Sequence, residues 1–215
     1  SAGGANALNY VLKTVEGPEI RETIYISAGD AKKNVNFYVS KDTKEKIYYP
    51  SFLLAESLCQ LTVGKSIGEM AVDKRTIKLR DWKQGKDVDT DVNMLIDLID
   101  QPVAAAVQFH IDDVTTKSGQ VVNGKDEYVP TGKFRNSNKV VKFFRNADLL
   151  TVPEILAGIT EASFHTLWLD EWKGKVNDVS KGISGAVQGA PGASTASTGT
   201  TAPPTGNLFV TAPKS

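Results

Sequence analysis

A short segment at residues 133–145, KFRNSNKVVKFFR, combines positive charge with aromatic rings. It holds five cations and three phenylalanines but no acid, although the whole chain is balanced at 25 Lys+Arg against 25 Asp+Glu. Cationic side chains bind phosphates, and aromatic rings stack on unpaired bases. The segment therefore points to single-stranded nucleic acid as a candidate ligand.

On a β-strand, successive side chains alternate between the two faces. Within residues 139–145, Lys142 and Phe144 would share one face, and Phe143 and Arg145 the other. Whichever face is buried, we expect a phenylalanine and a cation to stay exposed on the opposite face. The same residues also suit an ordinary strand, because aromatic residues are common in strands and lysines keep edge strands from aggregating.

Two further segments pair cations with aromatic rings. Residues 75–83, RTIKLRDWK, place two cations and a tryptophan on one expected strand face. Residues 36–49 add two tyrosines close to lysines. The candidate residues for binding single-stranded DNA are Tyr38, Tyr48, Lys78, Arg80, Trp82, Lys83, Lys133, Arg135, Lys139, Lys142, Phe143, Phe144 and Arg145.

Opposite charges are separated along the chain between residues 74 and 100. Residues 74–86 hold six cations and one acid, whereas residues 87–100 hold five acids and no cation. This separation fits a local electrostatic footprint for a polyanion. It fits two solvated loops of opposite sign equally well.

The motifs of catalysis and metal binding are incomplete in this sequence. The GKS at 64–66 lacks the glycine that a P-loop needs five residues earlier, where Cys59 stands. The aspartates of 87–93 are spaced like the start of a calcium loop, but Val92 and Leu98 replace its glycine and glutamate. Two histidines and one cysteine give no zinc-binding spacing. We therefore expect no enzymatic activity, no metal and no cofactor.

Hydrophobic periodicity predicts a mainly β protein with few helices. Helices are expected at 51–61, after a Thr151-x-x-Glu154 capping box and up to Gly158, and at 161–172. A hairpin turn is expected at Asn123-Gly124. Strands are expected at 21–27, 35–39, 47–49, 75–82, 101–114 and 139–145. Many short strands with a few appended helices favour an OB-like small β-barrel.

Composition divides the chain into two parts. Residues 1–178 are expected to form the OB-like nucleic-acid-binding domain. Residues 179–215 are rich in Gly, Ala, Ser, Thr and Pro, which cannot bury enough apolar surface to offset the entropy of ordering, so a flexible tail is predicted. Within this tail, NLFV at 207–210 is either a docking peptide or a few leftover apolar residues.

Targeting and redox signals point to a soluble, cytoplasmic protein. No run of eighteen apolar residues predicts a membrane span. The N-terminal sequence has no basic region followed by an apolar core, so no signal peptide is expected. A single cysteine cannot form an internal disulfide, which fits a reducing compartment.

Residues 129–175 resemble the C-terminal part of the single-stranded DNA-binding proteins of tailed bacteriophages. A Gly/Ser-rich tail follows this part in those proteins, as it does here. The resemblance rests on VPTG at 129–132, NKVVKFF at 138–144, TVPEI at 151–155, WKGK at 172–175 and, upstream, LIDLIDQPVAAAVQ at 95–108.

The resemblance implies an OB fold that binds single-stranded DNA with little sequence specificity and without catalysis. Its setting would be phage DNA replication, recombination or transcription in the cytoplasm of an infected bacterial host. A homo-oligomer and contacts with a phage polymerase or other replication and transcription proteins are further expectations. This tail carries almost no acid, whereas such proteins commonly recruit enzymes through an acidic tail, so NLFV would have to do so here.

The alternative is a non-enzymatic adaptor that binds other proteins. It would recruit a polymerase through the C-terminal helix bearing Trp168 and Trp172, or through the tail.

Overall fold

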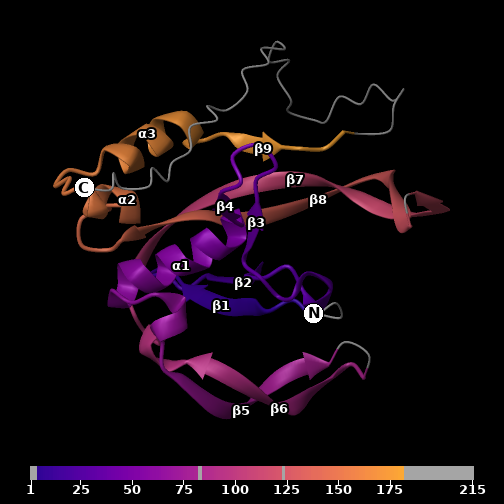
Figure 1. The fold of residues 1–215 in the computed structure, drawn as a ribbon, viewed down its shortest axis with the longest axis horizontal. Helices are drawn as coiled ribbons and strands as arrows, with labels where there is room; N and C mark the ends of the chain where they lie inside the picture. Colours follow the sequence, from indigo (N-terminus) through magenta and orange to yellow (C-terminus); the bar gives the residue numbers. More distant parts are fainter. Residues whose placement is uncertain (1–3, 82–83, 123, 182–215) are drawn as a thin grey trace. The chain divides into compact units, whose positions relative to one another are not determined.

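The computed structural model describes residues 4–81, 84–122 and 124–181. Within these residues the protein is mainly β, with three two-stranded sheets, one three-stranded sheet and three α-helices (Figure 1). No closed barrel is found among the sheets of this described part, so the mainly β prediction is confirmed and the OB-like barrel is not. The predicted tail lies outside the described residues from residue 182 onward, and so does NLFV.

The described chain divides into two compact units. Unit 1 comprises the described residues up to Val107 together with Lys139–Lys173, and unit 2 comprises Gln108–Asn138 and the described residues from Gly174 onward. None of the helices in the described residues is long and apolar enough to cross a membrane.

Unit 1 begins with two antiparallel strands, β1 (Ala7–Lys13) and β2 (Glu19–Tyr25). The 3₁₀ turn η1 (Asp30–Lys32) leads to a short antiparallel ribbon of β3 (Phe37–Val39) and β4 (Lys46–Tyr48). The strands predicted at 35–39 and 47–49 are confirmed, with slightly different bounds, and they pair with each other as a hairpin.

Helix α1 (Pro50–Val63) follows directly and lies across β1 and β2 (Figure 1). Pro50 stands in its first turn, where the missing N–H costs nothing. Gly64 ends it with a left-handed φ of 71°, which glycine adopts without strain. The helix predicted over 51–61 is thus confirmed with slightly wider bounds.

Strands β5 (Val72–Asp81) and β6 (Lys86–Leu95) form a second antiparallel ribbon, preceded by the 3₁₀ turn η2 (Ile67–Glu69) and followed by η3 (Ile96–Leu98). The two strands contact chiefly each other. The interpretation of residues 74–86 and 87–100 as two solvated loops is wrong, because most of both segments is strand.

The longest strands are β7 (Val103–Val122) and β8 (Lys125–Arg145), which run through both units. In unit 2, β9 (Val176–Asp178) pairs parallel to β7, giving the sheet order β8-β7-β9. Both long strands extend well beyond the predicted 101–114 and 139–145. Their outer parts are mostly exposed and rich in polar residues, so they lack the apolar alternation that marks a half-buried strand.

A hydrophobic core in unit 1 joins α1 to the inner part of β8. Its buried residues are Leu58, Leu61, Val140 and Phe143. Partly buried apolar side chains from β1, β2, α1, β7 and α2 pack around them. Burying such side chains is the main favourable contribution to folding, so this cluster holds the elements of unit 1 together.

One carboxylate connects β1, β2 and β8 at the edge of this core. Glu22 accepts a hydrogen bond from the Tyr10 hydroxyl and another, at 2.9 Å, from the backbone N–H of Val140. Burial, together with the hydrogen bond and the charge of Glu22, raises the pKa of the Tyr10 phenol far above its ordinary value. Tyr10 therefore stays protonated as the donor in this pair.

A second carboxylate organises the C-terminal helices α2 (Val152–Leu156) and α3 (Ser163–Trp172). Glu154 closes the predicted capping box on Thr151, which is confirmed, with its Oε2 2.8 Å from the Thr151 N–H. Its Oε1 accepts from the Phe164 N–H at 2.8 Å and the Ser163 hydroxyl at 3.0 Å. One buried side chain thus caps α2 and also binds the first turn of α3.

The ionised form of Glu154 is the form that this network favours. Burial raises the pKa of Glu154, but the N–H groups of Phe164 and Thr151 and the hydroxyls of Thr151 and Ser163 together hold it below its ordinary value. A lowered folded-state pKa means that the network stabilises the fold above the ordinary glutamate pKa of about 4.3. This stabilisation is lost as the pH falls through the lowered value.

Replacing Glu154 with glutamine should test this network. Glu154→Gln keeps the shape but loses the charged acceptor, so the free energy of unfolding at pH 7 should fall by about 1–3 kcal/mol. The loss of stability below about pH 4.5 should become shallower than in the wild type. Urea unfolding over a pH series measures both effects, and an unchanged acid dependence in the variant would contradict the assignment.

Candidate nucleic-acid interface

Both phenylalanines of the predicted binding strand lie in the interior of unit 1. Phe143 has no exposed surface, and its ring packs edge-on against Tyr10 at 5.9 Å between centroids. Phe144 is 2% exposed, and its ring lies 5.1 Å from the His165 ring of α3. The expectation that one of them would remain exposed is wrong, because α3 covers the face that the core leaves open. Neither ring is accessible to a base.

The cations of the same strand take part in the packing around α3 and the turn after β8. Lys142 is half-buried, with Nζ 5.1 Å from the centroid of the Phe164 ring, and this desolvation lowers its pKa. Arg145 Nη2 lies 2.5 Å from Asp148 Oδ2, and Nε bonds the same carboxylate. That contact raises the pKa of Arg145 and lowers the pKa of Asp148. Lys139 is half-buried.

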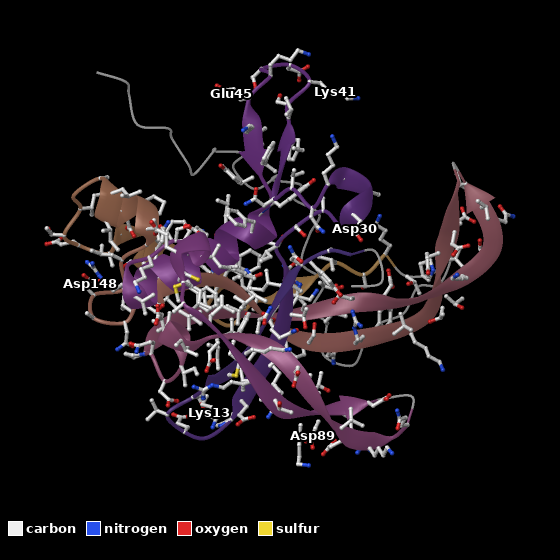
Figure 2. The ribbon with its side chains drawn as sticks, turned by 60° about the horizontal axis from the view of Figure 1, so that its bottom comes forward. Lys13, Asp30, Lys41, Glu45, Asp89 and Asp148 are labelled. Atoms are coloured by element: carbon white, nitrogen blue, oxygen red, sulfur yellow. The ribbon has the colours of Figure 1, made fainter. Side chains whose placement is uncertain are left out.

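The cations of β5 are matched by the acids of β6. The register places Lys78 opposite Asp89 and Arg80 opposite Asp87, with N–O distances of 3.3 and 3.5 Å. Lys74 reaches Asp91 diagonally at 3.2 Å. Figure 2 marks Asp89 on this ribbon. Each exposed pair contributes little to the stability of the fold, but together the pairs offset the positive potential that β5 would show to a polyanion.

The remaining candidates fall elsewhere. Lys133 and Arg135 are exposed on β8 in unit 2, and Arg135 lies 3.9 Å from Asp112. Trp82 and Lys83 lie outside the described residues. In the part of the chain that the structure describes, the candidate cations of β5 belong to unit 1, whereas those at 133 and 135 belong to unit 2.

The β3–β4 ribbon and the first turn of α1 carry a cluster of aromatic rings, which we call the aromatic ribbon: Phe37, Tyr38, Tyr48, Tyr49 and Phe52. Tyr48 is 44% exposed and stacks on Phe52, with ring centroids 5.4 Å apart and planes inclined by 26°. The edge-on contact of Phe37 with Tyr48 measures 6.0 Å. Lys46 Nζ lies 4.7 Å from the centroid of the Phe37 ring.

Tyr38 belongs to the opposite face of the same ribbon. It pairs with Ile47 in the register, is 48% exposed, and lies 6.0 Å from the Tyr49 ring. Tyr38 and Tyr48, grouped together by the sequence prediction, therefore offer their rings on two different faces. Each face keeps at least one ring that solvent can reach.

Positive charge is uncompensated around the aromatic ribbon. Residues 32–49 contain five lysines against two acids, a net charge of +3. Within the described residues, none of these lysines forms an ion pair with a carboxylate. Figure 2 shows Lys41 and Glu45 at the tip of the ribbon. This segment thus combines exposed rings with unmatched cations, which the strand at 139–145 does not.

Sequence reasoning missed four aromatic residues here: Tyr25, Phe37, Tyr49 and Phe52. The run of aromatic residues on both sides of the lysine-rich turn at 41–46 could have indicated three of them. No local sequence pattern links Tyr25 to this segment, because only the tertiary fold brings Tyr25 close to Tyr49. Tyr25 and Tyr49 both line a hollow of about 220 Å³.

Comparison of the chain with protein-family models, with curated proteins and with solved structures finds no match. In the described residues, no group of three or more His, Cys, Asp and Glu side chains is arranged to hold a metal ion. The function of the protein therefore has to be inferred from its own residues and their geometry.

Paired truncations should separate core rings from surface rings. Phe143→Ala removes a fully buried ring, so the free energy of unfolding should fall by about 3–5 kcal/mol. Tyr48→Ala removes a half-exposed ring and should cost about 1 kcal/mol or less. Equilibrium urea unfolding measures both variants. A stable Phe143→Ala protein would contradict the position of this ring in the core.

Proposed function

We propose that this protein binds single-stranded DNA with little sequence specificity, and that the aromatic ribbon supplies the stacking surface. The observation that carries the proposal is the combination of half-exposed tyrosines with a net charge of +3 over residues 32–49. Most of the other residues predicted to bind DNA are either packed in the interior or engaged in ion pairs, and this removes them from contact with a ligand.

The physical reason for a single strand lies in the two kinds of contact that the ribbon offers. Unpaired bases have free faces, and stacking one of them on an aromatic ring is worth about 1–3 kcal/mol whatever the base. The lysines bind phosphates and release counterions, which makes affinity fall with salt. A duplex already stacks its bases internally, so it would gain only the lysine contacts.

The resemblance to single-stranded DNA-binding proteins of tailed phages supports the same proposal. An OB-like barrel, roles in phage replication, recombination or transcription, and recruitment of a phage polymerase remain hypotheses within it. A structure determined with bound oligonucleotide would show whether the strands of unit 1 close around the DNA as an OB barrel does.

A protein-binding adaptor is the second candidate, and one observation favours it. Leu156 on α2 and Leu167 on α3 are strongly exposed apolar side chains, and Ile159 lies exposed between the two helices in sequence. Trp168 and Trp172 are only half-exposed. If α3 recruits a partner, the leucines are therefore the expected contacts rather than the tryptophans.

Fluorescence anisotropy of a labelled oligo(dT) strand and of its duplex, at low and moderate salt, tests the proposed function. Tight binding to the single strand that weakens steeply with salt is expected. Absence of binding to the single strand at low salt would overturn the proposal and leave the adaptor. Binding to both forms with equal affinity would show that the rings do not contribute.

Two substitutions and one matched control should locate the interface. Tyr48→Ala should weaken oligo(dT) binding by about 5- to 150-fold, since one stacked base is lost. Lys46→Gln should reduce the slope of log affinity against log salt by about 0.7, the value of one phosphate contact on a single strand. Lys78→Gln should change neither quantity measurably, because Asp89 already offsets that charge.

The control decides between two surfaces. If Lys78→Gln lowered affinity and the salt slope while Lys46→Gln changed neither, β5 rather than the aromatic ribbon would be the surface that meets the phosphates.

A further inference from the structure

We infer that the hollow beside the aromatic ribbon holds one nucleotide of the bound strand, with its base against Tyr25 and Tyr49 and its phosphate on Lys32. This inference rests on the proposed function and adds a nucleotide site on the Tyr38–Tyr49 side of the ribbon. The hollow measures about 220 Å³ and is lined by Tyr25, Ser27, Ala28, Lys32, Tyr49 and Ser51.

The chemistry of the lining selects the class of ligand. Two phenol rings offer apolar faces for a planar group, Lys32 offers a positive charge, and the lining residues include no carboxylate. A purely apolar ligand would leave the exposed Lys32 ammonium group without a partner in the hollow. A planar base joined to a phosphate satisfies both parts of the lining.

The loop that carries Lys32 is held in place by its own hydrogen bonds. Ser27, 8% exposed, accepts from the Asn6 N–H at 2.8 Å and donates to Asn34 Oδ1 at 2.6 Å. The Lys32 N–H bonds the carbonyl of Gly29, whose φ of 86° suits glycine. A loop that is ordered before binding pays less entropy when the ligand arrives.

The acid in this loop is turned to other partners. Asp30 Oδ1 accepts from Asn34 Nδ2 at 2.8 Å. The Asp30 carboxylate also packs against Gly4, where an added Cβ would lie 1.8 Å from Oδ2 (Figure 2 labels Asp30). Asp30 does not line the hollow, so a phosphate at Lys32 does not meet a carboxylate within it.

The hollow continues the exposed surface of the ribbon. Tyr38 is exposed, and its ring centroid is 6.0 Å from that of Tyr49, which lines the hollow. A single-stranded DNA that stacks one base on Tyr38 therefore brings a neighbouring nucleotide to the Tyr49 side of the hollow. Tyr48, on the other face, would contact a different part of the strand.

Photo-crosslinking of the full chain to oligo(dT) carrying a single 5-iododeoxyuridine tests this assignment. Mass spectrometry of the digested adduct should find crosslinks at Tyr25 or Tyr49. Tyr25→Ala should abolish the Tyr25 adduct and weaken binding by about 5- to 150-fold, whereas Tyr25→Phe should retain the affinity. Tyr128→Ala is the matched control, because Tyr128 in unit 2 is 56% exposed and Tyr25 is 52% exposed.

Lys32→Gln provides a second variant, since this exposed side chain can change without disturbing the fold. It should lower the salt slope by about 0.7. Crosslinks confined to Tyr38 or Tyr48, with Tyr25→Ala and Lys32→Gln binding like the wild type, would overturn the nucleotide in the hollow and leave the proposed function intact. Failure of the wild-type protein to bind oligo(dT) at low salt would overturn both.

Discussion

Burial of residues 139–145 from two sides is the constraint on which the rest of unit 1 depends. Phe143 fills the core under α1, while Phe144 lies against α3. Glu22 binds the Val140 N–H across 118 residues of sequence, and Glu154 joins α2 to α3 on the far side. A strand covered on both faces cannot also be a ligand surface. Its aromatic and cationic residues therefore organise the fold, and this is why the proposed DNA-binding surface is placed on the aromatic ribbon instead.

Electrostatic pairing decides where a polyanion can approach a chain of zero net charge. In the β5–β6 ribbon, cations and acids alternate across the ladder, so their potentials cancel at short range. Between residues 32 and 49 the lysines have no such partners among the described residues, and Lys46 lies over the Phe37 ring. The net charge of the chain is zero, yet the charges of the β5–β6 ribbon are paired and those of the aromatic ribbon are not. Of the two, the aromatic ribbon therefore keeps the positive potential that attracts phosphates.

Exposed rings are held in defined positions by buried or half-buried neighbours. Tyr48 rests on Phe52 in the first turn of α1, and Tyr38 rests on Tyr49. The proline that opens α1 places this turn directly after β4. A short ribbon of three-residue strands would be marginal alone, so its contact with the helix gives the proposed binding surface its rigidity.

The sequence by itself determined the features that depend on neighbours a few residues apart. The α1 helix, the capping box of Thr151 and Glu154, the β3–β4 hairpin and the mainly β character all follow from local capping, turn and periodicity rules. Only the tertiary structure decided that Phe143 and Phe144 are both buried and that Lys78 forms an ion pair with Asp89. It also decided that Tyr25 and Tyr49 line the same hollow. Burial and charge pairing depend on contacts between distant segments, and local patterns carry no information about which segment will cover a given face.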